Sequence, residues 1–542
     1  MARGRWATLE WKDPQRLSDD VDGHELIPIP IDIYQAIFSY FQPCDDLTAS
    51  ECKKILSNIS LSCRLLRGIT IPLLFQYLNI SGIGHNAFPR AGYVDFCSKV
   101  NADKPSAISL ARFIRECTFR DWPSPNSGPE SIRLKLYREC LNIYLPAFSR
   151  FENLQSLVFH SVMILPRILA SLTKLKRLRR LSFLECHFDE VTVENIENLQ
   201  IIPLTSFTLR SCSGSLTSKI HLGITTARLE EIRTDKWGVF ECLIDANGEL
   251  PSLKVLELDL LLDSDRSLRD VTESSFSIPA LRKSLERLPA LQELYLDNLK
   301  TFVMPRNVNP KPIQLPALRI VRCPFQVLAL LVSEELREVT TYQAISRFPS
   351  PTNPSTRSGV QLKSITFSEV VASQLTLLEV PMPWIVGLSL EELFPTLETL
   401  ALNHSGPYTV HVPPNSAITR EEVLDKDIIS ASEAWCHLKS LHELRLRVNH
   451  AFKDEIPWHL DVQHRLITQN LITATPTLDR VSFTLHVLWR RIPYGRADEW
   501  KPIVPVCKRE DVQDMLRILM ERLEEYPDVF VDYDGCFASL LS

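Results

Sequence analysis

Glycine is scarce in this sequence. The 542-residue chain contains only 16 glycines, whereas glycine makes up roughly 7% of an average soluble protein. Gly82-Ile-Gly84 lacks the third glycine and the following helix of a dinucleotide-binding loop. The GxxxxGK[ST], GxSxG and HExxH patterns are also absent. We therefore expect a non-catalytic protein that needs no cofactor.

Long apolar runs and paired cysteines are missing as well. The longest wholly apolar run after Pro324 is Val327–Val332, far shorter than the roughly 18 residues needed to cross a bilayer. No apolar stretch follows the charged N-terminus, so we predict no secretory signal. The thirteen cysteines are odd in number and form no CxxC pair. These features predict reduced thiols and an intracellular protein, in the cytoplasm, the nucleus or both, without membrane contact.

The sequence also lacks a surplus of positive charge. Its formal charge of −6 and pI of 6.2 argue against nucleic-acid binding, which needs a concentrated positive field. The densest groups of possible metal ligands are Cys436-His437 with His442, and the pair His459 and His464. The spacing of five between the paired histidines does not place them on one helical face, so we predict no metal site.

What the sequence does contain is a repeated leucine pattern. The unit is Leu-x-x-Φ-x-Φ, where Φ is usually apolar, and the first five starts are 24, 26, 25 and 24 residues apart. This period is typical of leucine-rich repeats, although the asparagine that often follows the unit is mostly missing. Twelve starts are found, at Leu154, Leu178, Leu204, Leu229, Leu253, Leu291, Leu318, Leu336, Leu362, Leu397, Leu441 and Leu478.

The repeats predict an α/β solenoid over residues 151–542. Short parallel strands would line its concave face, and helices such as Pro166–Leu175 and Ala280–Leu288 would form the convex layer. Irregular spacing between starts predicts insertions near 259–290, 301–315, 348–360 and 403–440. An apolar face from Val512 to Leu523 predicts a capping helix over 509–526, followed by a short strand at Val529–Val531.

The chain before the repeats divides into three parts. Residues 1–25 form a polar leader that we expect to be disordered, residues 26–80 form a helical domain, and residues 81–150 lead into the solenoid. In the helical domain, Ile33 and Ile37 share one apolar helix face, and Tyr34 and Phe38 form a second row. A helix with two apolar sides can pack within its own bundle and also against a partner. A helical bundle without a partner is the alternative reading.

The helical domain resembles an F-box. Its opening, Ile29-Pro30-Ile31-Asp32-Ile33 followed by Ile37-Phe38, is similar to the Leu-Pro-x-Glu-Leu/Ile and Ile-Phe pattern of that family. Leu61-Ser-Cys-Arg64 resembles its Val-Cys-Arg element. Ile71-Pro-Leu-Leu-Phe75 is similar to an ending common in fungal members. The resemblance covers about 50 residues, and the stretch between Leu47 and Leu61 is longer than the family's norm.

The resemblance implies a function. F-box proteins with leucine-rich repeats are substrate receptors of Skp–cullin–F-box ubiquitin ligases. This chain would bind the Skp adaptor, and through it cullin, while the solenoid would hold a protein substrate. The adaptor-binding residues implied by the resemblance are Pro30, Ile33, Ile37, Phe38 and Leu61. A non-ligase scaffold or adaptor is the second hypothesis, and an enzyme built from the insertions between Leu362 and Leu478 is the third.

Strand alternation identifies the side chains that would line the concave face. The candidate substrate-binding residues are Glu231, Asp235, Glu257, Asp259, Glu293, Tyr295 and Asp297 in the middle units, and Arg445, Arg447 and Arg480 in the late units. The groove would thus change from acidic in its middle to basic near its C-terminal end, a charge order that favours a complementary partner. A merely solvated strand face is the alternative.

Overall fold

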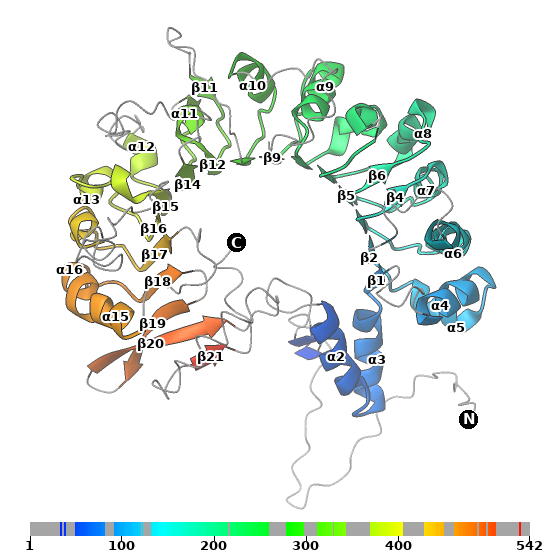
Figure 1. Cartoon of the computed structure of the whole chain (residues 1–542), viewed down its shortest axis with the longest axis horizontal. Coiled ribbons are helices and arrows are strands. Elements are labelled where there is room, and N and C mark those ends of the chain that lie inside the picture. The colour runs from blue at the N-terminus through cyan, green and yellow to red at the C-terminus, as the bar shows by residue number, and fades with distance from the viewer. Residues whose placement is uncertain are drawn as a thin grey trace, which may run out of the picture.

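Strands and helices alternate along the chain and build a curved array. The computed structural model describes residues 33–34, 37–38, 49–81, 91–120, 122, 132–214, 217–259, 278–297, 312–328, 330–342, 369–404, 428–448, 460–484, 487–494, 497–505 and 530–532. The strands line the inner side of an arch and the helices lie along its outer side (Figure 1). This is the mixed α/β fold with a long parallel sheet that the repeat pattern predicts.

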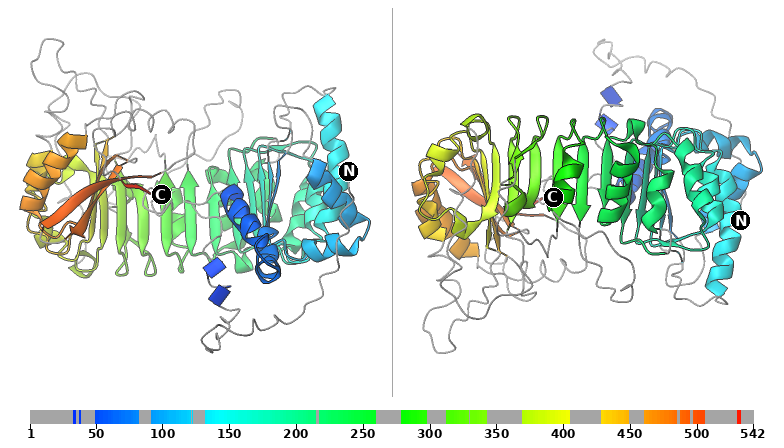
Figure 2. Two further views of the ribbon diagram at one scale, coloured as in Figure 1. Left: turned by 90° about the horizontal axis from the view of Figure 1, so that it is seen from below. Right: turned by 90° about the horizontal axis from the view of Figure 1, so that it is seen from above.

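The main sheet runs along the whole arch (Figure 2). Its parallel strands pair in chain order. They are β1 Tyr77–Ser81, β2 Glu116–Arg120, β3 Ser156–His160, β5 Arg180–Leu184, β7 Ser206–Arg210, β8 Glu231–Thr234, β9 Val255–Asp259, β10 Glu293–Asp297, β12 Ile320–Pro324, β14 Glu338–Tyr342, β15 Leu377–Pro381, β16 Thr399–His404, β17 Glu443–Val448 and β18 Arg480–Thr484. Each repeat thus contributes a strand to one continuous surface.

The C-terminal end of the sheet changes direction. β19 (Val487–Tyr494) pairs antiparallel with β18 and with β20 (Ala497–Pro505), and β21 (Phe530–Asp532) pairs parallel with β20. Two smaller parallel pairs are β4 (Met163–Ile164) with β6 (His187–Phe188), and β11 (Ile313–Gln314) with β13 (Leu331–Val332).

Short helices join the strands. The α-helices are α2 Ala49–Ser60, α3 Arg64–Leu74, α4 Ala91–Asn101, α5 Pro105–Ala111, α6 Ile132–Phe148, α7 Pro166–Leu172, α8 Val193–Glu197, α9 Trp237–Asn247, α10 Ile278–Leu285, α11 Phe325–Leu328, α12 Glu369–Ala372, α13 Leu390–Leu393, α15 Leu460–Arg465 and α16 Ile472–Ala474. The 3-10 turns are η2 Asn198–Ile201, η3 Thr217–Gly223, η4 Thr226–Arg228 and η7 Met382–Trp384, and η8 Leu466–Leu471 is a π-helix. α7 and α10 fall in the segments that the sequence predicts as helical.

The core lies between the sheet and the helices. The apolar residues of each strand point toward the helices, and parallel register aligns them from repeat to repeat. Leu256 and Leu258 of β9 are fully buried, and Leu294 and Leu296 pair with them from β10. No single repeat can bury such a face alone, so stacking supplies the core.

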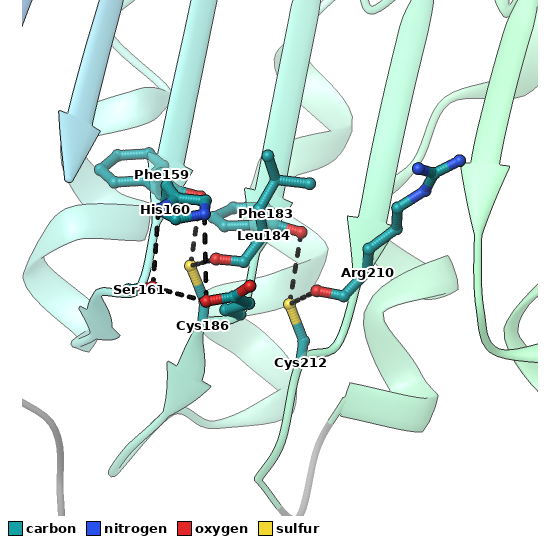
Figure 3. Close-up of polar contacts among 9 residues, drawn as sticks. Phe159, His160, Ser161, Phe183, Leu184, Cys186, Arg210 and Cys212 are labelled. Atoms are coloured by element: carbon teal, nitrogen blue, oxygen red, sulfur yellow. Dashed lines mark hydrogen bonds and ion pairs between the residues drawn. The ribbon is translucent and has the colours of Figure 1, made fainter. Parts of the chain in front are cut away.

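The turn after each early strand has a repeated design. The residue that follows β3, β5 and β7 has a left-handed backbone, at Ser161, Glu185 and Ser211 respectively. One residue after Glu185 and one after Ser211, a cysteine follows. The Cys186 thiol lies 3.3 Å from the carbonyl oxygen of Phe159, and the Cys212 thiol lies 3.3 Å from that of Phe183 (Figure 3). Each thiol therefore donates to a carbonyl group of the preceding repeat. These cysteines occupy the position where leucine-rich repeats have asparagine or cysteine.

The boundaries of the solenoid differ from the sequence expectation. The sheet begins at β1, well before residue 151, and β2 pairs directly with β3. β14 pairs directly with β15, so the strand expected after Leu362 does not lie between them. The strand follows Leu375 instead, and Leu362 lies outside the described residues.

Several predicted segments lie wholly or partly outside the described residues. The leader 1–25, the insertion 348–360 and the capping helix 509–526 lie wholly outside them. Parts of the other three insertions are described. The segment 259–290 contains α10, the segment 301–315 ends in β11, and 403–440 includes helical residues 428–432.

Candidate protein-binding surfaces

The concave face of β7–β14 brings together most of the predicted substrate-binding residues. Glu231 lies on β8 and Asp235 directly follows it. Glu257 and Asp259 lie on β9, whereas Glu293, Tyr295 and Asp297 lie on β10. Each alternates along its strand with buried residues that point toward the helices, so these side chains point into the arch. We call the charged and aromatic side chains of this face, from Arg210 to Tyr342, the concave cluster.

Arginines interleave with the carboxylates of the concave cluster. Arg210 forms an ion pair with Glu257, and Arg233 forms ion pairs with Glu231 and, at 3.3 Å, with Glu257. Arg322 lies 2.8 Å from Asp297. Arg210 and Arg322 are not among the substrate-binding residues predicted from the sequence. The alternation of the repeat strands places both arginines on the concave face and could have identified them. Only the register between strands shows which carboxylates they contact.

Carboxylates still outnumber cations in the concave cluster. The seven carboxylates are Glu231, Asp235, Glu257, Asp259, Glu293, Asp297 and Glu338, and the three arginines are Arg210, Arg233 and Arg322. Asp259 and Asp297 are direct partners across the β9–β10 ladder. Burial raises the pKa of Asp297, and the charges of Asp259 and Glu257 raise it further, although Arg322 opposes them.

The raised pKa of Asp297 predicts a pH effect on stability. The ionised form of Asp297 is less favourable in the folded protein than in the unfolded chain. Ionisation of Asp297 therefore lowers the free energy of unfolding, and this loss of stability develops as the pH rises from the pKa of the unfolded state through the higher pKa of the folded state. We therefore expect Asp297→Asn to raise the melting temperature at pH 7 and to have a smaller effect near pH 4. Thermal unfolding of both proteins across this range measures the difference. A variant that is less stable at pH 7 would contradict the prediction.

The tyrosines of the concave cluster are held by hydrogen bonds. The Tyr295 hydroxyl donates to a Glu293 carboxylate oxygen at 3.0 Å. Burial raises the pKa of Tyr295, and the nearby carboxylates of Glu293, Glu338 and Glu257 add to this shift. The Tyr342 hydroxyl donates to the carbonyl oxygen of Leu296. Both rings therefore have fixed positions on the concave face.

The C-terminal end of the face is less basic than the sequence suggests. The Arg445 side chain is only 17% exposed and lies 2.7 Å from Glu443, which is itself 8% exposed. Arg480 lies 3.7 Å from the same carboxylate and 3.6 Å from Asp479. Arg447 lies on β17, but its side chain is outside the described residues. Pairing within the chain thus neutralises part of the expected positive field.

A second surface lies on the N-terminal helical segment. Ile33 and Ile37 are each 48% exposed, and Leu61, between α2 and α3, is 81% exposed. Among the described residues, large hydrophobic side chains are exposed at seven positions, and these three are among them. Leu61 lies three residues before Arg64, the first residue of α3, and the thiol of the N-cap residue Cys63 accepts a hydrogen bond from the Leu66 N–H.

Two of the predicted adaptor-binding residues differ from this group. Phe38 is only 6% exposed, so its side chain belongs to the interior of the segment, and its ring stacks on Tyr34 with 6.4 Å between centroids. The sequence predicts that one side of the short helix packs within its own bundle and that another packs against a partner, and the predicted adaptor-binding residues come from both apolar rows. In the isolated chain the side chain of Phe38 is therefore used for packing, whereas its role in adaptor binding stays a prediction. Pro30 lies outside the described residues.

The part of the chain that the structure describes contains neither a metal-binding cluster nor a membrane-spanning helix. No group of three or more histidine, cysteine, aspartate or glutamate side chains is arranged to hold a metal ion there. Nor is any helix within that part both long and apolar enough to span a bilayer.

Comparison with known proteins yields structural likenesses only. No family model matches the sequence, and no curated protein matches it. Among the solved structures that resemble parts of the chain are three of leucine-rich-repeat proteins. The first is Toll in the Toll–Spätzle complex from Drosophila, with 13% identity, 75% of this chain and 54% of that chain covered, and a TM-score of 0.30.

The other two likenesses are similar in kind. TLR13 in its complex with ssRNA13 has 13% identity, covers 77% of this chain and 48% of its own, and has a TM-score of 0.25. An internalin from Listeria monocytogenes has 14% identity, covers 68% of this chain and 91% of its own, and has a TM-score of 0.23. The chain spans about half the length of the first two structures. The repeat fold therefore rests on the register and burial described above.

Proposed function

We propose that this chain is the substrate-binding subunit of a Skp–cullin–F-box ubiquitin ligase. The supporting observation is the exposure of Ile33, Ile37 and Leu61 on the helical segment that resembles an F-box. Large apolar side chains that stay exposed in the folded chain are common at protein interfaces, because a partner can remove them from water. In this proposal the Skp adaptor covers them, and cullin joins through the adaptor.

The solenoid supplies the second half of the proposed function. Its concave face would hold a protein target so that a separate conjugating enzyme can transfer ubiquitin to the target. The advantage of such an assembly is proximity, since it converts a bimolecular encounter into a local one. The chain would carry no catalytic residue of its own and would act in the cytoplasm, the nucleus or both. A non-ligase scaffold with the same two surfaces is the alternative.

Co-purification with the Skp adaptor tests the proposal. We expect the double variant Ile33→Asp, Leu61→Asp to lose adaptor binding by at least about 100-fold, because two charges would be placed in a desolvated apolar interface. The matched control is Ile201→Asp, Ile429→Asp, which alters isoleucines that are 71% and 44% exposed on the solenoid. This control should bind the adaptor normally.

The remaining outcomes separate the two functions. Cullin recovered together with the adaptor supports the ligase, whereas adaptor without cullin supports the scaffold. No adaptor binding by the wild-type chain would refute both forms of the F-box proposal. Circular dichroism of every variant shows whether the solenoid remains folded.

A further inference from the structure

We infer that one edge of the solenoid binds an acidic segment of a partner protein. This inference goes beyond the proposed function and does not depend on it. The segments 112–115, 149–155 and 173–179 precede β2, β3 and β5, and they lie side by side along one edge of the sheet because these strands are parallel and paired. The cations of these segments, which we call the basic rim, are Arg112, Arg115, Arg150, Lys174, Lys176, Arg177 and Arg179.

The first step is the surplus of positive charge. The three segments contain a single carboxylate, Glu152, which lies 3.9 Å from Arg112. Arg150 lies 3.3 Å from Asp103. Within the described part of the chain, the other five cations of the basic rim form no ion pair. Of these five, Arg177 and Arg179 donate to neutral oxygens, whereas the other three are exposed and make no side-chain contact of this kind.

The second step is the contrast with the rest of the same edge. In segments 226–230, 249–254 and 286–292, which precede β8, β9 and β10, cations and carboxylates are equal in number: Arg228, Lys254 and Arg287, with Glu230, Glu249 and Glu286. Lys254 lies 2.9 Å from Glu230 of the neighbouring repeat, and Arg287 lies 3.0 Å from Asp245. The chain therefore balances its own charge there, whereas the basic rim keeps a positive surplus in a protein of net charge −6.

The third step is the rigidity of the basic rim. A dense run of lysine and arginine can act as an extended transport signal when it is free to leave the fold. In the run 174–180, however, Leu175 and Leu178 are buried in the core. The Arg177 side chain donates to the Asn153 amide oxygen, and the Asn153 amide nitrogen donates to the carbonyl oxygen of Arg112. The basic rim is therefore a fixed surface, to which a partner must bind from outside.

The fourth step is the distribution of the charges. The Gln155 N–H donates to the carbonyl oxygen of Arg115, and the Arg179 N–H donates to that of Gln155. Arg115 and Arg179 are therefore two strand spacings apart, or about 10 Å. A single phosphate group is bound best by donors that converge on one point. Positive charge spread over this distance is better matched by several carboxylates along a protein segment.

The fifth step favours a protein over a nucleic acid. Single-stranded nucleic acids stack their bases on exposed aromatic rings. The aromatic residues of the three segments are Phe151, which is buried, and Phe113, which is half-buried. The exposed apolar residue beside the basic rim is instead Ile201 of η2, which is 71% exposed, and η2 packs against α7, the helix that leads to Lys174. An acidic segment that also carries apolar residues matches both features.

Fluorescence anisotropy of the full-length chain at low salt tests this inference. The probe is a labelled twelve-residue peptide, (Asp-Glu-Leu)₄, and the comparison peptide has asparagine and glutamine in place of the acidic residues. We expect the wild-type chain to bind the acidic peptide and not the neutral one. The rim variant Arg115→Gln, Lys174→Gln, Lys176→Gln should weaken binding about tenfold, since each exposed charge pair contributes modestly. It breaks no ion pair of the described residues, so its melting temperature should match that of the wild type.

The matched control removes the same charge from the C-terminal half. Arg337, Lys439 and Arg465 are exposed, and Arg337→Gln, Lys439→Gln, Arg465→Gln should change the dissociation constant less than about twofold. Ile201→Ala should weaken binding of the acidic peptide about threefold and should not affect a peptide with serine in place of leucine. Equal weakening by the two triple variants would show that net charge alone matters and would overturn the inference.

Three further outcomes would overturn it as well. The first is no binding of the acidic peptide by the wild type. The second is tighter binding of a twelve-nucleotide single-stranded RNA that the rim variant loses, which would assign the basic rim to nucleic acid. The third is tighter binding of a neutral peptide with one phosphoserine. The rim variant should co-purify with the Skp adaptor as the wild type does, so failure of the ligase proposal would leave this inference intact.

Discussion

Replacement of Phe183 by alanine is expected to lower the free energy of unfolding by about 3–5 kcal/mol. Phe183 is fully buried on β5, and its ring lies 5.6 Å from that of Phe159, 5.3 Å from that of Phe188 and 6.4 Å from that of Phe207. Register aligns it with Phe159 on β3 and Leu209 on β7. Its removal would leave a cavity between consecutive repeats and take away three aromatic contacts.

Chemical denaturation measures this effect. Because each repeat is stabilised by its neighbours, a cavity between two repeats should also broaden the denaturation transition, as the repeats on either side of it begin to unfold separately. Phe183→Leu provides a graded control with a smaller loss, on the order of 1 kcal/mol, since leucine already occupies the equivalent position on β7. Ile201→Ala, at an exposed site, should stay within about 0.5 kcal/mol of the wild type. A Phe183→Ala variant that unfolds like Ile201→Ala would contradict the prediction.

The strands of the repeats from Leu154 to Leu291 could be predicted from the sequence because each follows a clear leucine pattern. From Leu154 to Leu291, each predicted start is followed by a strand of the parallel sheet. The burial of the inward-facing residues also explains why some strands could not be predicted. In the unit that contains β2, the three inward positions are filled by Ile114, just before the strand, and by Cys117 and Phe119 within it, and all three are buried. These residues serve the core as leucine does, but a search based on leucine does not find them.

The composition of the surfaces was only partly predictable. Alternation places Glu257 and Tyr295 on the concave side, as expected, because a period of two fixes the face of every strand residue. The formation of ion pairs depends on the register between repeats and on the length of the side chains. The ion pairs of Arg210 and Arg322 could therefore not be derived from the sequence of a single strand. The burial of Phe38 could not be predicted for a similar reason. An apolar row on a helix does not indicate whether it packs within the chain or against a partner protein.

The close approach of successive repeats at Gly214 leads to the second large effect. Gly214 has φ +119°, and a Cβ atom added there would lie 2.5 Å from the carbonyl oxygen of Phe188. The backbone on both sides is fixed, because the Phe188 N–H donates to the Ser213 carbonyl at 2.9 Å. Gly214→Ala therefore combines an unfavourable backbone conformation with a steric clash, and we expect a loss of about 2–5 kcal/mol.

Two other glycines separate the contributions to this loss. Gly248 has φ +78° but nothing within 4 Å of an added Cβ, so Gly248→Ala should cost only the backbone strain, about 1–2 kcal/mol. Gly92, in α4, has open space and no positive φ, so Gly92→Ala should stabilise the protein by about 0.5 kcal/mol. Urea denaturation of the three variants should rank them in this order. If Gly214→Ala were no more costly than Gly248→Ala, the turn after β7 would be able to move away from β6, and the tight contact between these repeats would not be needed for stability. A larger loss at Gly214 would instead mean that this chain, with so few glycines, uses one of them where two repeats approach too closely for any other residue.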